Sequence, residues 1–395
     1  MTAHVFRSRL RPWGSGSTPR PTPVLVLVLV LALALAGCSG SAHGAAGATA
    51  ATTKEGSAQG AQAPAIGADH DCIVSGSGTP QVAWSTMRNP ILSDAVAGEK
   101  DQALVWAGGQ WHMLFSFVTG AGAAPGSEHW DIATATSPDL VHWSAPVPWP
   151  AQSGTVGVAS PDIVRSPSGS FVATYDSIAE VGGGQSKLYY RTSPDLESWS
   201  APHSLALSLH PGPGERMIDP TLAWTGHGLI LGYKYGMASG TGAQHFEVAW
   251  SASGSIDGPW TAMGQPDISV YDDTVENLEF VAVAGRWRLV ATSNTFDQPW
   301  IFDLVGDPEV PGSWLHWDHG RMLVVPGQMW DTGSGVSSVN YEHANSVFLC
   351  DARTADGYYY ITYAGSDELT QFGGWGHAEI GIARSTDLIH WSVPG

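Results

Sequence analysis

The sequence predicts an all-β protein, a five-bladed β-propeller that follows a signal peptide and a disordered tether. The composition suits turns and strands, with 48 Gly, 26 Pro and 18 Trp but only 13% charged residues. A motif with a fixed turn and a fixed Trp recurs along the chain, as expected for a ring of similar units. Strand-like runs of apolar and aromatic residues lie within these units, for example at residues 110–117 and 357–363.

The first 38 residues have the features of a lipoprotein signal peptide. Arg7, Arg9 and Arg11 precede an apolar run at residues 24–36, which is too short to span a bilayer as a helix and is typical of an exported leader. The run ends in Leu-Ala-Gly-Cys38, which resembles the lipobox of bacterial lipoproteins. This resemblance implies that Cys38 is acylated and becomes the new N-terminus. An ordinary signal peptide with an incidental cysteine is the alternative.

A tether is expected at residues 39–70, which are nearly all Ala, Gly, Ser, Thr and Gln and cannot bury enough apolar surface to fold. The folded domain is then expected at residues 71–395. We therefore expect an exported monomer held on the extracellular face of the cell membrane by lipid on Cys38.

The charge balance excludes several classes of partner. With 36 acidic and 17 basic residues the net charge is −19, and it becomes −23 without the four arginines of the leader. Such a surface repels nucleic acid and sulfated or uronic polymers, whereas neutral sugars are compatible with it. Zinc and EF-hand motifs and a serine-hydrolase elbow are absent from the sequence.

Two cysteines remain if Cys38 takes lipid. Cys72 lies at the start of the expected domain and Cys350 near its end, and an exported protein can form a disulfide between them. Closing a loop of this length stabilises the fold by on the order of 5 kcal/mol in the chain-entropy model. Such a bridge would close a ring of repeats; two buried free thiols are the alternative.

The repeat has the form Ser-x-Asp-Leu-x-x-Trp. Three clear copies and two degenerate ones end at Trp143, Trp199, Trp260, Trp317 and Trp391. Their spacings of 56, 61, 57 and 74 residues predict five blades. We expect the Asp of each clear copy to satisfy backbone N–H groups of a turn rather than to take part in chemistry.

A second pattern places a carboxylate seven to nine residues before a Gly turn in four units. These carboxylates are Asp101, Asp162, Asp219 and Glu276. If they lie on the innermost strand of each blade, their side chains converge on the central funnel. Carboxylates that face one another in a cleft have pKa values that move apart, which is the condition for separate acid and base roles.

These motifs resemble the five-bladed glycoside hydrolases of family 43 and their relatives in families 62, 32 and 68, over about residues 80–395. The segment Ile-Asp219-Pro resembles the family strand whose Asp tunes the acid. Lys-Asp101-Gln resembles the first-blade strand that carries the general base, and Glu276-Asn-Leu-Glu279 resembles the strand that carries the general acid. The resemblance implies inverting hydrolysis of α-L-arabinofuranosides or β-D-xylosides from plant cell walls.

The identity of the acid stays open between two residues. Glu276 and Glu279 are three positions apart, so on a regular strand they point to opposite faces and only one can enter the funnel. The distance from Glu276 to Gly285 matches the family spacing, which favours Glu276.

Other site residues follow from the same resemblance. Asp162 is expected to support the site or to contact substrate, and Trp106 and Trp130 are candidates for stacking against sugar rings. His343 lies in a segment similar to one that approaches a central metal ion in some family members. No cofactor is required, although the resemblance allows a structural calcium or sodium ion in the central channel.

Departures from the family pattern keep other functions open. Asp101 is followed by Gln instead of Pro, and Glu276 lacks the following Gly-Pro pair. These changes suit a non-catalytic carbohydrate-binding propeller or a purely structural scaffold. A five-bladed glycosidase that acts on fructosides or galactosides is a further alternative.

Overall fold

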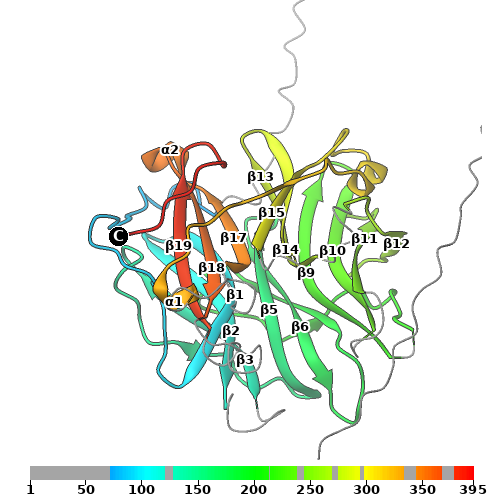
Figure 1. Cartoon of the computed structure of the whole chain (residues 1–395). Coiled ribbons are helices and arrows are strands. Elements are labelled where there is room, and N and C mark those ends of the chain that lie inside the picture. Colours follow the sequence, from blue (N-terminus) through cyan, green and yellow to red (C-terminus); the bar gives the residue numbers. More distant parts are fainter. Residues whose placement is uncertain are drawn as a thin grey trace, which may run out of the picture. The chain divides into compact units, whose positions relative to one another are not determined.

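The computed structural model describes residues 72–120, 128–212, 214–237, 244–268, 275–293, 298–332, 344–366 and 378–395. These residues form five antiparallel sheets, and the first strands of the sheets contact one another in a closed order, β1–β5–β9–β13–β17–β1 (Figure 1). The prediction of an all-β five-bladed propeller is confirmed. The predicted leader and tether, with Cys38, lie outside the described residues, as does His343.

Each blade runs outward from its first strand in chain order. Blade 1 comprises β1 (Ala97–Ala107), β2 (Gln110–Thr119), β3 (His129–Ser137) and β4 (Val147–Pro148). Blade 2 comprises β5 (Thr155–Arg165), β6 (Phe171–Glu180), β7 (Leu188–Ser193) and β8 (His203–Ser204). Blade 3 comprises β9 (Glu215–Thr225), β10 (Gly228–Met237), β11 (Gln244–Ser251) and β12 (Thr261–Gly264). Blade 4 comprises β13 (Val275–Val283), β14 (Arg286–Ser293), β15 (Gln298–Asp303) and β16 (Arg321–Met322). Blade 5 comprises β17 (Asn345–Asp351), β18 (Tyr359–Gly365) and β19 (Glu379–Ser385).

Helical structure among the described residues is limited to short segments between strands. They are the 3-10 helix η1 (Pro311–Leu315) and the helices α1 (Met329–Thr332) and α2 (Arg353–Asp356). In the described ranges, none of the helices has the length and apolar character needed to cross a membrane.

The Ser-x-Asp-Leu repeat forms a tight turn at the end of the third strand of a blade, as the sequence predicts. The hydroxyl of Ser137 accepts the N–H groups of Asp139 and Leu140 at 3.2 and 2.9 Å. Asp139 Oδ1 accepts the N–H groups of Val141 and His142, the two residues that follow Leu140. The turn directs Leu140, which is fully buried, into the core. The copies that begin at Ser193 and Ser385 make the same bonds.

The ring closes between blade 5 and blade 1. Leu92 pairs with Ile380 of β19, and Asn89 exchanges hydrogen bonds with the backbone of Ile382 on the same strand. Cys72, beside the end of β1, forms a disulfide with Cys350 of β17, with a Cα–Cα distance of 5.3 Å. The chain before β1 therefore acts as an outer partner of the last blade, and the expected disulfide joins the two ends.

We expect reduction of this disulfide to lower the melting temperature of the domain markedly. The bridge spans 278 residues and stabilises the fold by on the order of 5 kcal/mol by restricting the unfolded chain. Thermal unfolding followed by circular dichroism, with and without dithiothreitol, measures the effect. The Cys72→Ser/Cys350→Ser variant should melt at the lower temperature under both conditions. A wild-type protein whose melting temperature is the same with and without dithiothreitol would contradict the expectation.

Candidate active site

A β-bulge recurs at one position in the inner strand of every blade. In each case one extra residue interrupts the pairing with the second strand, and a non-glycine residue with positive φ lies in the bulge. These residues are Asp101, Ser160, Asp219, Asn277 and Ser346, with φ between 51° and 54°. Bulges bend a strand and change the direction of its side chains. Here they bring five backbone positions to the wall of one central cavity.

The predicted carboxylates lie at three different sequence positions relative to the bulge residue of their strand. Asp101 and Asp219 lie in it, Glu276 lies one residue before it, and Asp162 and Glu279 lie two residues after it. The Gly-turn spacing therefore grouped residues that are not structurally equivalent. All of them nevertheless come from inner strands, as the sequence predicts.

The bulge also corrects the argument that separated Glu276 from Glu279. Their partners on β14 are Thr292 and Val290, which are two residues apart and so share one face of the sheet. The extra residue in β13 cancels the odd spacing. Both carboxylates therefore lie on the same face of β13.

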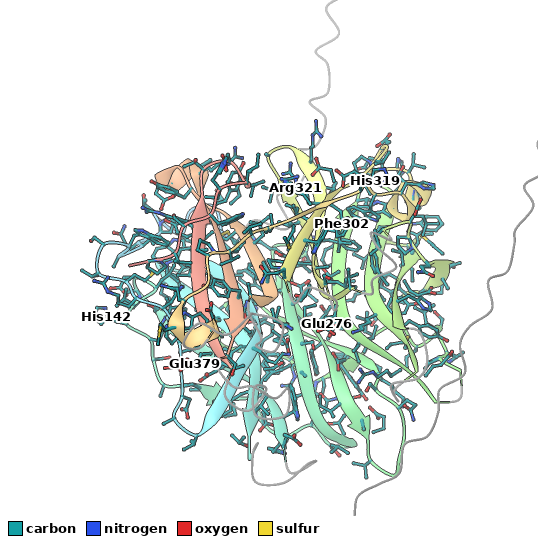
Figure 2. The ribbon with its side chains drawn as sticks, viewed as in Figure 1. His142, Glu276, Phe302, His319, Arg321 and Glu379 are labelled. Atoms are coloured by element: carbon teal, nitrogen blue, oxygen red, sulfur yellow. A yellow bond between two sulfur atoms is a disulfide. The ribbon has the colours of Figure 1, made fainter. Side chains whose placement is uncertain are left out.

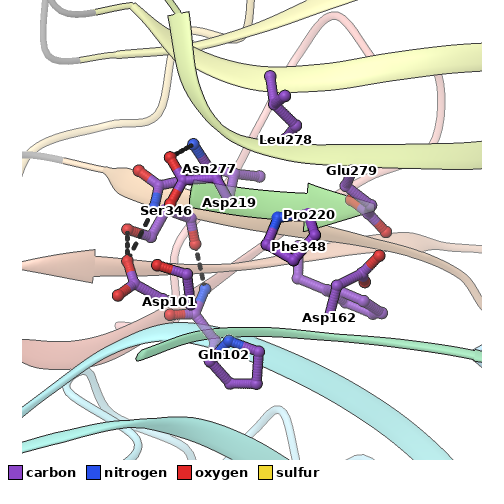
Figure 3. Close-up of a pocket in the computed structure, with 13 residues that line it drawn as sticks. Asp101, Gln102, Asp162, Asp219, Pro220, Asn277, Leu278, Glu279, Ser346 and Phe348 are labelled. Carbon is purple, nitrogen blue, oxygen red and sulfur yellow. Dashed lines mark hydrogen bonds between the residues drawn. The ribbon is translucent and has the colours of Figure 1, made fainter. Parts of the chain in front are cut away.

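The central cavity has a volume of about 30 Å³, which is room for roughly two water molecules. Figure 3 shows Asp101, Asp219 and Ser346 toward one end of the group of lining residues, and Asp162 and Glu279 toward the other. Glu276 does not line the cavity. Figure 2 labels it in the middle of the ring of blades.

Asp101 is held by residues from three blades. Its Oδ1 accepts hydrogen bonds from Asn277 Nδ2 at 2.8 Å and Ser346 Oγ at 2.6 Å, and its Oδ2 accepts one from Ser116 Oγ at 2.8 Å. Lys100 Nζ lies 3.8 Å from Oδ1. A carboxylate accepts about four hydrogen bonds, so these three donors leave one acceptor site on Oδ2. The carboxylate is thus fixed in orientation and still able to accept a proton.

Asp219 lies next to a second buried carboxyl group. Its N–H donates to Asp176 Oδ1 at 3.1 Å, and its own Oδ2 accepts the N–H of Asn277 at 3.0 Å. Burial, and then the charge of Asp219, holds the pKa of Asp176 well above its ordinary value. Burial also raises the pKa of Asp219, and the charges of Glu276 and Asp101 reinforce burial while Lys234 opposes it. Such a pair retains a proton more readily than an isolated carboxylate.

Glu276 is in a different electrostatic environment. Its Oε2 accepts a hydrogen bond from Lys234 Nζ at 2.6 Å, and its side chain is 27% exposed whereas that of Lys234 is 5% exposed. Burial pushes the pKa of Glu276 upward, but Lys234 and Lys100 outweigh burial, so the pKa lies below its ordinary value. The free protein therefore holds Glu276 as a carboxylate.

Asp162 and Glu279 form a second acidic pair. Burial raises the pKa of Asp162 to about 7, and its Oδ2 lacks a hydrogen-bond partner among the described residues. Burial and the charge of Asp162 hold the pKa of Glu279 well above its ordinary value, and its Oε2 accepts the N–H of Leu349 on β17 at 2.8 Å. Glu279 thus connects blade 4 to blade 5.

The two predicted tryptophans do not line the cavity. Trp106 is 2% exposed and donates from Nε1 to the carbonyls of Ser77 and Gly78, so it belongs to the core under the N-terminal segment, which corrects the prediction of a sugar contact. Trp130 is partly buried on β3 beside Gly157, three residues before the bulge of blade 2.

The described residues do not form a set of metal ligands. They contain no group of three or more His, Cys, Asp or Glu side chains arranged to hold a metal ion. The central-channel residues that are described therefore do not fit a calcium or sodium ion bound by such side chains. A metal ion near His343 stays a prediction, and no chemical step below depends on it.

Several site residues were missed from the sequence. Asn277 and Ser346 occupy the bulges of blades 4 and 5, and alignment of all five inner strands at the bulge would have found them. Asp176 and Lys234 lie on second strands, opposite Ala159 and Ile218. The spacing from carboxylate to Gly turn marks inner strands only, so it carries no signal for residues that reach the site from the neighbouring strand.

Comparison with known proteins supports the fold. A solved structure described as a glycoside hydrolase is 13% identical, covering 80% of this chain and 96% of its own, with a TM-score of 0.56. A GH62 hydrolase solved with xylotriose is 12% identical, covering 75% and 95%, with a TM-score of 0.51. An α-L-arabinofuranosidase from Lactobacillus brevis is 12% identical, covering 76% and 93%, with a TM-score of 0.50. None of the family models and none of the curated proteins compared with the sequence matches it. At these identities the likeness shows a shared fold, the five-bladed propeller of glycoside hydrolases.

A further buried carboxyl group lies two residues before Asp101. Glu99 is completely buried, and burial together with the charges of Asp94 and Glu379 raises its pKa to about 8. Its pKa in the unfolded chain is about 4.5. Between these values the folded protein binds a proton that the unfolded chain releases, so stability falls as the pH rises.

We expect the Glu99→Gln variant to lose less stability than the wild type between pH 5 and pH 8, because it has no proton to release. At pH 8 the variant should be more stable by about 2 to 4 kcal/mol. Urea unfolding at both pH values measures this difference. Glu197→Gln, which changes an exposed carboxylate, should leave the pH dependence unchanged. A Glu99→Gln protein with the wild-type pH dependence would show that Glu99 is not the group responsible.

Proposed function

We propose that this protein is a glycoside hydrolase that cleaves glycosidic bonds by a single displacement with inversion. The observation that carries the proposal is the convergence of Asp101, Asp219 and Glu276 from blades 1, 3 and 4. Asn277 connects the first two through its side chain and its N–H. Lys100 acts on Asp101 and on Glu276.

Asp101 is proposed as the general base. Its free acceptor site on Oδ2 takes a proton from a water molecule while that water's oxygen attacks the anomeric carbon. A cavity of about 30 Å³ admits water but excludes a sugar ring, so the sugar would bind outside it. The three hydrogen bonds to Asp101 orient the carboxylate before substrate arrives, which reduces the reorganisation required in the transition state.

Glu276 is proposed as the general acid, and Asp219 as the group that adjusts it. As the bond from the anomeric carbon to the leaving oxygen breaks, Glu276 gives that oxygen a proton and becomes a carboxylate. At the end of the turnover Asp101 is protonated and Glu276 is a carboxylate. Asp101 then releases its proton to solvent, and Glu276 takes up a proton from solvent. At 27% exposure, Glu276 is more accessible than Asp101 and Asp219, as contact with a leaving group requires.

Neutral plant-type saccharides are the proposed substrates, with α-L-arabinofuranosides or β-D-xylosides as the first candidates. The net charge of −23 of the exported part disfavours polyanionic chains. Two proteins of the same fold support this choice, one named as an α-L-arabinofuranosidase and one solved with xylotriose.

We expect Glu276→Gln to lower kcat/KM on aryl arabinofuranosides or xylosides by about 10²- to 10⁴-fold, because the leaving oxygen loses its proton donor. Nitrophenyl leaving groups need less protonation than alkyl ones, so the decrease in kcat/KM of Glu276→Gln should be smaller on nitrophenyl glycosides than on alkyl glycosides. Asp101→Asn should lose activity on both kinds of substrate equally. Release of reducing sugar and of nitrophenol from the purified domain measures these effects.

Glu279→Gln is the matched control, since glutamine can still accept the N–H of Leu349, and it should stay within about threefold of the wild type. Loss of activity in this variant, with activity kept in Glu276→Gln, would assign the acid to Glu279. Binding of oligosaccharides without turnover over a panel of arabinosides, xylosides, fructosides and galactosides would instead identify a non-catalytic binding propeller.

We also propose that the full chain is attached to the extracellular face of the membrane through lipid on Cys38. In a bacterial host, Cys38→Ala should move the protein from the detergent-soluble membrane fraction to the aqueous fraction and abolish incorporation of labelled fatty acid. The Cys72→Ser/Cys350→Ser variant controls for loss of other thiols. A Cys38→Ala protein that remains with the membrane would reject this attachment.

A further inference from the structure

A hydrogen bond between blades recurs next to the bulges. In three blades, a side-chain oxygen on the second strand accepts the N–H of the bulge residue of the following blade. The pairs are Ser116 with Ser160 at 2.9 Å, Asp176 with Asp219 at 3.1 Å, and Thr292 with Ser346 at 2.9 Å. We call this contact the inter-blade latch. It fixes these three bulges relative to the previous blade.

Blade 3 departs from this arrangement at the edge of the candidate active site. The residue at the latch position is Lys234, opposite Ile218, and an ammonium group cannot accept a hydrogen bond. The N–H of Asn277 bonds instead to Asp219 Oδ2 at 3.0 Å. Lys234 Nζ donates to Glu276 Oε2 at 2.6 Å.

This ion pair differs from the exposed pairs on the surface. The Lys234 side chain is only 5% exposed, so water screens its charge poorly. The charged groups that act on Glu276 are Lys234 from β10, Lys100 from β1 and Asp219 from β9, and Asn345 of β17 also donates to it. Two lysines thus act on a residue that resembles the family's proton donor. A proton donor must instead be neutral before it can act.

We propose that Lys234 is a positioning residue that holds Glu276 ionised and fixed in the free protein, and that Glu276 leaves Lys234 when it takes up from solvent the proton that it then transfers to the leaving oxygen. The first part stands on the geometry of the pair, whereas the second rests on the proposed glycosidase function. Binding of substrate at Glu276 and release from Lys234 are then coupled, so that the acid becomes active only when the site is occupied.

A double-mutant cycle tests the pairing without any need for activity. Urea unfolding at pH 7 is compared for the wild type, Lys234→Met, Glu276→Gln and the double variant. We expect the two positions to be coupled by about tenfold or more in the unfolding equilibrium constant, because the pair is largely buried. The control is the same cycle at the surface pair Lys187 and Glu180. Lys187 Nζ lies 3.6 Å from Glu180 Oε2 and the lysine side chain is 54% exposed, so this pair should show less than about threefold coupling.

Coupling at Lys234 and Glu276 no larger than at the surface pair would overturn the proposal. If Lys234→Met does not fold, Lys234→Gln and Lys234→Arg replace it in the comparison. Lys234→Arg keeps the charge and should retain most of the stability that Lys234→Gln loses. Equal stability of these two variants would also reject a role for the charge.

The pH profile of kcat/KM tests the second part. Its alkaline limb reports the acid of the free enzyme, so Lys234→Met should move that limb upward by about one pH unit or more. Lys234→Arg and the surface variant Lys187→Met should leave it in place. An unmoved limb in Lys234→Met would reject the coupling to catalysis. A wild type inactive on every glycoside would reject the proposed function, and the double-mutant cycle would still decide the pairing.

Discussion

The geometry of the centre depends on one backbone constraint, the bulge with positive φ in each inner strand. Left-handed backbone costs a non-glycine residue about 1 to 3 kcal/mol and persists only where surrounding contacts over-determine it. The inter-blade latches and the hydrogen bonds to Asp101 and Asp219 are such contacts. Asp and Asn tolerate this conformation better than most residues, and they occupy three of the five bulges. Backbone strain at the centre is thus balanced by the same polar groups that form the site.

The carboxyl groups at the centre lie in different electrostatic environments. Burial dominates around Asp162, Asp176 and Glu279, so each of these carboxyl groups keeps its proton more readily than in water. Cations dominate around Glu276 and keep it ionised. Acid–base catalysis uses neighbouring carboxyl groups whose environments move their pKa values apart. At Glu276 the difference comes from two lysines, Lys234 on the second strand of blade 3 and Lys100 on the first strand of blade 1.

The parts of the structure that the sequence predicted are those encoded locally. Three Ser-x-Asp-Leu copies and two degenerate ones predicted five blades, and each clear copy forms its turn with its own neighbours in the chain. Asp101 and Asp219 were found because they precede a hairpin at a regular distance. The alternation argument for Glu279 was wrong, because a bulge adds a residue that no local motif announces. Lys234 could not be found, because its partner lies on another blade, 42 residues away.

The contacts that close the ring between blades 5 and 1 also hold a residue of the candidate active site. Asp101 belongs to the first blade, yet Ser346 of the last blade donates to its Oδ1, and Gln102 Nε2 donates to the carbonyl of Ser346 at 2.6 Å. The same two blades are joined by the disulfide and by the pairing of Leu92 with Ile380. The orientation of Asp101, the proposed base, therefore depends on a contact between the two ends of the chain. The disulfide joins the same two blades as this contact, so opening of the ring between them would remove the hydrogen bond that Ser346 gives to Asp101.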